Sequence, residues 1–246
     1  MKILNIDSYP NLFNHFQISS SYIIDSIKEY KLSFPKKRDI LVEWNLRLPT
    51  FINSFYKYLY NNNDILNQKD FFDYYMYDNK TYFDYNNFDS EILSAVMARV
   101  YRAYPSIVRD LHFNVLAYEQ LKGSTVLYNR KLDIEEGIDL LIKEKNSIYA
   151  VNLFTETPNS RIGREKKENR HKPFKNVNYI DLPISLNDVN RFGDFFLYGE
   201  SQLDKIKKII YLPWPLYFFA TPVLLFPKEI FLDSDEDLPF AAMRQI

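Results

Sequence analysis

The sequence predicts a mixed α/β protein with a mainly helical N-terminal portion and a mixed β-sheet, flanked by helices, in its second half. All five glycines lie after residue 122, and glycine supplies the backbone conformations that tight turns between strands need. Short β-like runs alternate with helical patterns between residues 125 and 209. With 246 residues, 46% of them hydrophobic, the chain is long enough to bury a sizeable core.

The glycine-free first half has helical spacing. Apolar residues recur at three- and four-residue intervals over 12–34 and 41–60, which predicts two amphipathic helices separated at Pro35. Residues 70–88 interleave tyrosine and phenylalanine with aspartate and asparagine. Aromatic side chains can stack on nucleic-acid bases, but this stretch is acidic and stacking platforms sit in positive grooves. We therefore interpret it as packed structure.

A long helical pattern opens at Asp89 and runs to Leu121, with an interruption expected at Pro105 because proline breaks helix interiors. The elements expected after it are strands over 125–128, 138–142 and 148–155, a helix over 161–171, a strand over 177–184 and a helix over 202–209. Mixed elements in this order predict one sheet with helices packed on it.

We divide the chain into three regions. Residues 1–89 form a mainly helical region for recognition or dimerisation, 90–210 an α/β core, and 211–246 an apolar C-terminal segment that packs on the core. The most apolar run, 209–226, contains three prolines, so we expect buried irregular structure there and no membrane span. The start of the chain lacks the apolar stretch of a secretory signal, and we expect a cytoplasmic protein.

Composition excludes several kinds of chemistry. The net charge of −1 shows no overall basic field, and zero cysteines exclude disulfides, thiolate zinc sites and cysteine nucleophiles. The three histidines are too scattered for a histidine-rich metal site. The absence of a Walker loop, a Rossmann glycine fingerprint, a G-x-S-x-G elbow and H-E-x-x-H argues against nucleotide hydrolases, oxidoreductases, esterases and zincins.

Asp139 is the most informative residue, because it stands in the apolar run Gly137–Ile142. An unpaired charge there is costly, so the carboxylate needs a metal, a cationic partner or a structural hydrogen bond. Glu119 lies near the end of the preceding helix, and two carboxylates brought together by a helix and a hairpin can hold Mg²⁺. Glu119 equally fits a solvent-facing position, and we place the competing carboxylate Glu136 in the turn before the strand.

The helix, the Gly-Ile-Asp strand and the hairpin after it resemble the PD-(D/E)XK nuclease superfamily, the fold of many type II restriction endonucleases, over about residues 91–210. In that superfamily a helix supplies a glutamate, a hairpin strand an aspartate, and the neighbouring strand a (D/E/Q)-x-K triplet. The resemblance implies a restriction-endonuclease-like fold with Glu119 and Asp139 as metal ligands. It places Asn152-Leu153-Phe154 at the triplet, with the carbonyl of Leu153 as a further ligand.

This triplet departs from the family pattern. Asn152 is a weaker ligand than a carboxylate, and Phe154 replaces the lysine. Alternate residues of a strand share a face, so Glu156 or Asn152 completes the ligand shell. We expect the missing cation to come from the following helix, where Arg161, Arg164, Lys166 and Lys167 are within reach, and we choose a lysine of the Lys166-Lys167 pair, with Lys166 as the candidate. Without such a cation, the chain would keep the fold and lack the reaction.

The activity that the resemblance implies is hydrolysis of phosphodiester bonds by a Mg²⁺- or Mn²⁺-dependent DNA endonuclease, restriction-enzyme-like or from a defence or mobile-element system. Cutting both strands of double-stranded DNA normally requires two active sites, so a homodimer is expected. The alternative is a catalytically inactive, nuclease-like module that binds nucleic acid or protein, and the degenerate triplet is its main support.

A basic segment follows the expected active strand. Residues 161–175 hold seven Lys/Arg against two Glu, and concentrated cations of this kind contact phosphates. The same segment also fits a solvated helix with internal Glu–Lys pairs. The residues that we expect to contact DNA are Arg102, Arg109, Arg161, Arg164, Lys167, Arg170 and His171.

Overall fold

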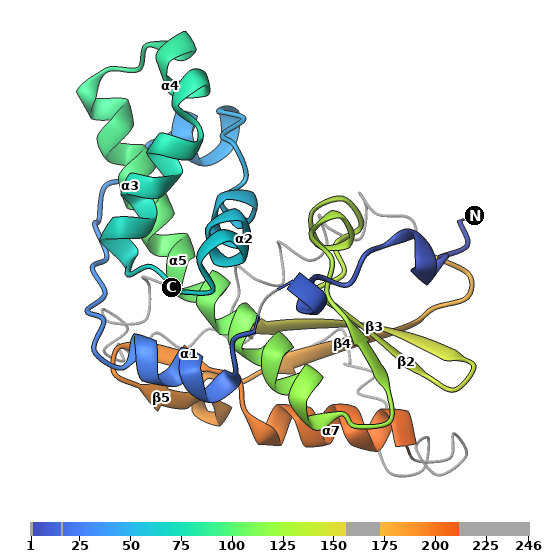
Figure 1. Ribbon diagram of the computed structural model, residues 1–246. Helices are drawn as coiled ribbons and strands as arrows, with labels where there is room; N and C mark the ends of the chain where they lie inside the picture. The colour runs from blue at the N-terminus through green and yellow to red at the C-terminus, as the bar shows by residue number, and fades with distance from the viewer. Residues whose placement is uncertain (1, 16, 156–172, 212–246) are drawn as a thin grey trace, which may run out of the picture.

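The computed structural model describes residues 2–15, 17–155 and 173–211. Within these ranges the prediction of a mixed α/β protein is confirmed, because a four-stranded sheet that contains both parallel and antiparallel pairs packs against helices (Figure 1). The helices are α1 Ser20–Ile27, α2 Phe51–Asn62, α3 Gln68–Asp78, α4 Lys80–Asn86, α5 Ser90–Gln120 and α7 Glu200–Tyr211. The strands are β1 Thr125–Leu127, β2 Leu140–Glu144, β3 Ser147–Thr155, β4 Asn178–Ile184, β5 Asn190–Phe192 and β6 Phe195–Leu197.

The main sheet has the strand order β1-β2-β3-β4, and β5 with β6 forms a separate hairpin. β1, β2 and β3 pair antiparallel, whereas β3 and β4 are parallel. β2 begins at Leu140, opposite Val151, so the last four residues of β3 extend beyond the end of β2. This extension pairs with β4 on its other side, where Asn152 lies opposite Asp181.

Strand alternation gives the sheet two apolar faces. Tyr149 and Val151 of β3 belong to the main core, which α5 covers, while Ala150 between them belongs to a smaller core on the opposite face. The N-terminal segment contributes Leu4 to that smaller core, and the Leu4 amide donates to the Asn176 side chain (2.8 Å). Residues 2–15 therefore lie against the sheet, although we grouped them with the helical region.

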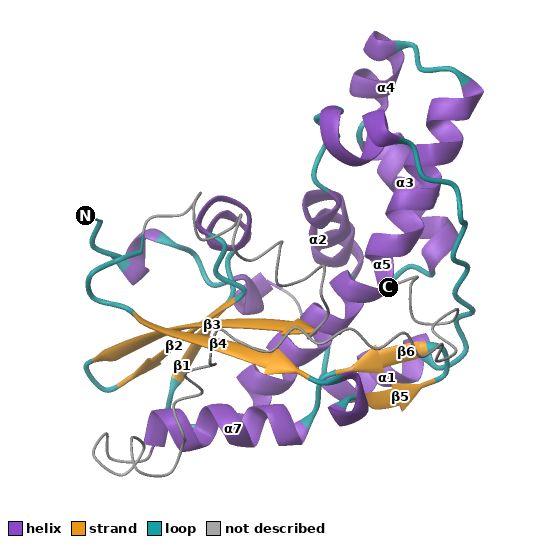
Figure 2. Cartoon of the chain, turned by 180° about the vertical axis from the view of Figure 1, so that it is seen from behind, coloured by secondary structure: helices purple, strands orange, loops and turns teal. Residues whose placement is uncertain are grey.

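The helical part rises from one end of the sheet, and α5 runs through both (Figures 1 and 2). Asp89 caps the start of α5 by accepting a hydrogen bond from the Ile92 amide (2.8 Å). The interruption predicted at Pro105 is wrong, because α5 continues through it. Proline leaves the carbonyl of Tyr101 without its helical donor, and the Gln68 side-chain amide of α3 donates to that carbonyl instead (2.9 Å).

The predicted helix over 41–60 starts ten residues late. Residues 41–45 form one separate wide turn, and α2 begins only at Phe51, after Pro49. The residue before a proline is disfavoured in helical conformation, which separates the turn from the helix. The helix predicted over 12–34 is likewise limited to α1, which Ser19 caps by accepting from the Tyr22 amide (3.1 Å).

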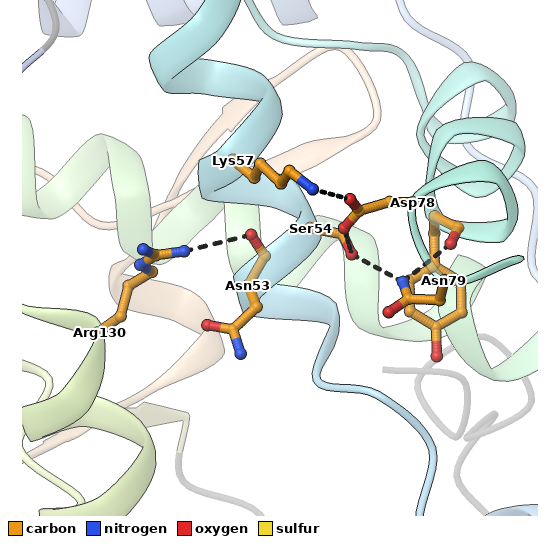
Figure 3. Close-up of polar contacts among 7 residues, drawn as sticks. Asn53, Ser54, Lys57, Asp78, Asn79 and Arg130 are labelled. Atoms are coloured by element: carbon orange, nitrogen blue, oxygen red, sulfur yellow. Dashed lines mark hydrogen bonds and ion pairs between the residues drawn. The ribbon is translucent and has the colours of Figure 1, made fainter. Parts of the chain in front are cut away.

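Polar contacts hold α2 between the helical part and the sheet (Figure 3). On one side Ser54 donates to Asp78 (2.7 Å) and accepts from Asn79 (2.9 Å), and Lys57 pairs with the same aspartate. On the other side Arg130 donates to the carbonyl of Asn53 (3.5 Å), so residues after β1 reach the start of α2. The close-up thus shows side chains from distant parts of the sequence converging on one helix.

The expected strands over 125–128, 148–155 and 177–184 and the helix over 202–209 correspond to β1, β3, β4 and α7. The helix expected over 161–171 and most of the apolar C-terminal run lie outside the described residues. None of the helices in the described ranges has the length and apolar character needed to cross a bilayer.

Candidate active site

Asp139 lies immediately before β2, beside the extension of β3. Its amide donates to Oδ1 of Asn152 (3.3 Å), and its Oδ2 accepts from the amide of Leu153 (3.1 Å). Leu153 lies beyond the part of β3 that pairs with β2. Its backbone amide therefore donates to the Asp139 carboxylate and not to a backbone carbonyl of β2. The structure therefore brings together Asp139 and the first two residues of the degenerate triplet.

A second carboxylate joins them from β4. Nδ2 of Asn152 donates to Oδ1 of Asp181 (3.0 Å), so the buried Asn152 amide connects the two aspartates. From α5, Asn114 approaches the carbonyl of Asp139 (3.5 Å). We call Asp139, Asn152, Leu153 and Asp181 the Asp139 cluster.

Arg109 of α5 approaches the end of β3 from the face of the main core, whereas Asn152 and Asp181 lie on the opposite face of the sheet. Its side chain is only 13% exposed, and its Nη1 donates to the Thr155 hydroxyl at the end of β3 (3.2 Å). The guanidinium carbon lies 4.7 Å from the centre of the Tyr198 ring, within cation–π range. Nε also contacts the Asp110 carboxylate (3.4 Å).

These surroundings keep Arg109 charged. Burial by itself lowers its pKa, but Asp110 and Tyr198, with a smaller contribution from Asp139, outweigh burial and raise the pKa above its usual value. Burial also raises the pKa of Tyr198, against the opposing effect of Arg109. Arg109 therefore carries a fixed positive charge that is held by Asp110, Thr155 and Tyr198.

The expected meeting of Glu119 and Asp139 is not what the structure shows. Glu119 instead accepts hydrogen bonds from the amide (3.0 Å) and hydroxyl (2.5 Å) of Ser20, at the first turn of α1. It follows Asn114 by five residues, which places it about 140° around α5 and about 7.5 Å further along. α1 and the β2–β3 hairpin lie on opposite sides of α5 (Figures 1 and 2). A carboxylate at the start of a helix has a structural role there.

Arg102, expected to contact DNA, is also engaged within the protein. Its guanidinium donates to the carbonyls of Pro35 (3.1 Å) and Lys37 (2.9 Å) and pairs with Glu43, and its side chain is 13% exposed. Arg102 therefore holds the segment before α2 against α5. Glu156, Lys166, Arg161, Arg164, Lys167, Arg170 and His171 lie outside the described residues.

The Asp139 cluster fits a magnesium ion in its donor types. Mg²⁺ is typically held by one or two carboxylates together with water, and the cluster contains the carboxylates of Asp139 and Asp181, with Asn152 bonded to the Asp139 backbone amide and to the Asp181 carboxylate. No group of three histidine, cysteine or acidic side chains suited to a metal occurs within the described ranges. A magnesium site here would therefore depend on two carboxylates without Glu119.

A separate pocket of about 400 Å³ opens between the N-terminal segment, the start of α2 and the turn after β1. It is lined by Tyr9, Asn53, Arg130, Lys131 and Glu135, among others, and none of its lining residues belongs to the Asp139 cluster. Lys131 and Glu135 lie 3.9 Å apart across one turn, so these two opposite charges balance each other.

Sequence reasoning missed Asp181, Asn114 and Tyr198. Asp181 alternates with Ile180 and Leu182 in a stretch that the sequence predicts as a strand, and that alternation places it on the face opposite the main core. Its position beside Asn152 depends on the register between two strands whose paired residues are 29 apart in sequence, and a local sequence pattern does not contain that register.

Comparison with protein-family models, with curated proteins and with solved structures finds no match to this chain.

Proposed function

We propose that the protein is a cytoplasmic, metal-dependent DNA endonuclease with a restriction-endonuclease-like core. The observation that carries this proposal is the Asp139 cluster: an aspartate directly before a hairpin strand contacts Asn152 and Leu153 of the neighbouring strand, and Asn152 bonds to Asp181. Arg109 contacts Thr155 at the end of the same strand. The resemblance implied this pairing of aspartate and triplet.

In this proposal Asp139 and Asp181 hold Mg²⁺ or Mn²⁺, and Arg109 takes the role for which we expected Lys166. The bound ion supplies Lewis-acid chemistry, polarising the scissile phosphate and lowering the pKa of an attacking water. Arg109 positions a phosphate oxygen and stabilises the negative charge that develops in the transition state. Thr155 and Tyr198 orient the guanidinium, and Asn152 connects the backbone amide of Asp139 to the Asp181 carboxylate.

The substrate that we propose is DNA, and cleavage of both strands calls for a homodimer. A monomeric enzyme would nick supercoiled plasmid and accumulate open circles, whereas a dimer would produce linear plasmid directly. Sedimentation of the free protein and analysis of the plasmid products together distinguish the two cases.

A second candidate function is a nuclease-like module that binds nucleic acid or protein without cutting. The favouring observation is that Asn152 uses both ends of its amide in hydrogen bonds within the cluster. Phe154, in the lysine position, has no charge to offer.

Cleavage assays on variants test both candidates. Wild-type protein is incubated with supercoiled plasmid and oligonucleotides in Mg²⁺, Mn²⁺ or EDTA. We expect Asp139→Asn and Asp181→Asn to lose at least 100-fold of a metal-dependent activity and Arg109→Met to lose about 10³-fold. Glu119→Gln is the matched control and should cut at nearly the wild-type rate.

Full activity of Asp139→Asn, or cleavage that persists in EDTA, would contradict the endonuclease. DNA binding without cleavage, by both wild type and Asp139→Asn, would favour the non-catalytic module. Circular dichroism of each variant ensures that loss of cleavage is not loss of fold.

A further inference from the structure

The pocket of about 400 Å³ between the N-terminal segment, α2 and the turn after β1 has three walls that are fixed to one another. Asn129, which is 7% exposed, donates to the carbonyl of Pro10 (2.8 Å) and accepts from the amide of Lys131 (2.9 Å), so it joins the N-terminal wall to the turn. Arg130 donates to the carbonyl of Asn53 (3.5 Å) and so joins the turn to α2. We call this cavity the Arg130 pocket; its volume and its fixed walls are typical of sites for small ligands.

Part of the lining of the Arg130 pocket is apolar. Tyr9, Pro10 and Ile134 contribute to it, and of these Tyr9 and Ile134 are half-buried. A flat ring bound against these residues would leave water on that side, which stabilises binding in proportion to the apolar area that is covered. The pocket therefore favours a ligand with an aromatic or apolar part over a bare inorganic ion.

The Arg130 pocket also carries a positive charge. Lys131 and Glu135 of the lining lie 3.9 Å apart and balance each other, which leaves the charge of Arg130. The guanidinium carbon of Arg130 lies 5.6 Å from the centre of the Tyr60 ring, and among the residues that the structure describes this arginine pairs with no carboxylate. A guanidinium held over a ring, with several N–H donors left for a ligand, is suited to phosphate.

Asn53 adds a side-chain amide to the lining. It extends from α2 on the side of Arg130, away from the contacts between Ser54 and Asp78 (Figure 3). The residue is exposed, and its amide takes part in no hydrogen bond within the described part of the chain. An amide offers donors and an acceptor together, which is the combination that pairs with the edge of a nucleic-acid base. The lining thus provides a partner for each part of a nucleotide: the ring, its edge and the phosphate.

We propose that the Arg130 pocket binds one nucleotide, with the base against Tyr9 and Ile134, the edge of the base on Asn53 and the phosphate on Arg130. A free nucleotide and a nucleotide turned out of a DNA strand present the same chemistry to these residues. The inference rests on the proposed function only where the nucleotide belongs to DNA, because that strand then also reaches the Asp139 cluster.

The position of the pocket allows one strand to reach both sites. Tyr9 packs against the smaller core that contains Ala150, and Asn152 follows Ala150 by two positions in β3, so both lie on the face of the sheet opposite the main core. Figures 1 and 2 show the N-terminal segment and the turn after β1 on one side of the sheet and α7 on the other. Glu135 precedes Asp139 by four residues, so their Cα atoms are at most about 14 Å apart. At about 3.4 Å per nucleotide, this is the length of about four nucleotides.

Calorimetric titration of the full chain in EDTA, which prevents metal-dependent cleavage, tests binding of the free ligand. The probes are deoxyadenosine monophosphate, deoxyadenosine and inorganic phosphate. We expect the monophosphate to bind at least about tenfold more tightly than either of the other two, since it alone uses both the apolar lining and the arginine. Equal affinity for inorganic phosphate would overturn the inference, because a general anion site would explain it.

A DNA duplex with the fluorescent adenine analogue aminopurine opposite an abasic site tests the nucleotide within DNA. The emission of the analogue rises when it leaves the base stack, so a rise on binding reports a nucleotide turned out of the duplex. A rise without affinity for the free monophosphate assigns the pocket to DNA, and the reverse assigns it to free nucleotides. Absence of both signals would overturn the inference.

Variants show whether either signal comes from the Arg130 pocket. Arg130→Met should weaken binding about tenfold or more through the lost bond to phosphate, and Ser8→Trp, at an exposed lining residue, should block the pocket by filling it. Arg191→Met is the matched control: Arg191 also lies over a ring, 5.8 Å from the centre of Phe196, but does not line the pocket, so this variant should bind as the wild type does. Wild-type affinity in both Arg130→Met and Ser8→Trp would refute the assignment, and circular dichroism checks that each variant is folded.

Failure of this inference is distinguishable from failure of the endonuclease, because binding is measured without metal. Protein that cuts DNA but gives neither binding signal would refute the Arg130 pocket alone. Protein that cuts no DNA but binds nucleotide in a manner that Arg130→Met weakens would refute the endonuclease and support the pocket. Asp139→Asn should keep the wild-type affinity for the monophosphate.

Discussion

Gln68 compensates for the proline in the middle of α5, and this role can be measured. The side chain is 3% exposed, and all of its hydrogen bonds go to backbone groups: it accepts from the Ser33 amide (2.7 Å) and donates to the carbonyls of Ser33 and Tyr101 (both 2.9 Å). Only the bond to Tyr101 replaces one that Pro105 removes. Gln68→Leu keeps the approximate volume and leaves three partly buried backbone groups without this partner.

The expected cost follows from counting these bonds. At about 1 kcal/mol of net stability for each hydrogen bond, Gln68→Leu should lower the free energy of unfolding by about 3 kcal/mol. In a Pro105→Ala background the amide of residue 105 can donate to Tyr101 again. The same substitution should then cost about 1 kcal/mol less, which is the coupling energy of the double-mutant cycle.

Urea unfolding followed by circular dichroism gives the four free energies of this cycle. Gln202→Leu is the matched control, because Gln202 is completely buried and also bonds to backbone groups, the Gly199 amide and the Asp188 carbonyl. Its cost should be the same with and without Pro105. An equal cost of Gln68→Leu in both backgrounds would refute the idea that its amide substitutes for the missing helical bond.

Three further predictions concern other parts of the fold. Burial lowers the pKa of His112 to about 4 from an unfolded value of 6.5, so the neutral imidazole contributes stability above pH 6.5 that is lost as pH falls toward 4. His112→Phe should therefore reduce the difference in unfolding free energy between pH 7 and pH 4 by on the order of 3 kcal/mol, measured by urea titrations at the two pH values. Glu119→Ala should lower stability by about 1–2 kcal/mol through its lost contacts at the start of α1, whereas unchanged thermal unfolding would contradict the structural role. Gly193→Ala should cost about 1–3 kcal/mol, because φ is 58° and a Cβ would lie 2.8 Å from the Lys28 carbonyl oxygen. Gly123→Ala shares the strain of a positive φ (101°) but has no atom within 4 Å of the added Cβ, so comparing the two in thermal melts isolates the effect of the contact with Lys28.

The sequence by itself determined the class of the fold and the part of the chain where the candidate site lies. Period-two alternation and glycine turns predicted β1, β3 and β4, because these patterns depend on neighbouring residues only. Asp139 stood out for the same local reason, a charge in an apolar run, and its contact with Asn152 follows from a short hairpin.

The tertiary structure alone decided which partners the polar side chains have. Glu119 and Arg102 carry the charges expected of ligands to metal and phosphate. In the structure, however, Glu119 is hydrogen-bonded to Ser20 and Arg102 is paired with Glu43. Within α5, the carbonyl that Pro105 leaves without a helical donor accepts a hydrogen bond from Gln68 of another helix. Such partners are separated by tens of residues, and their positions depend on strand register and helix packing, which local sequence patterns do not contain.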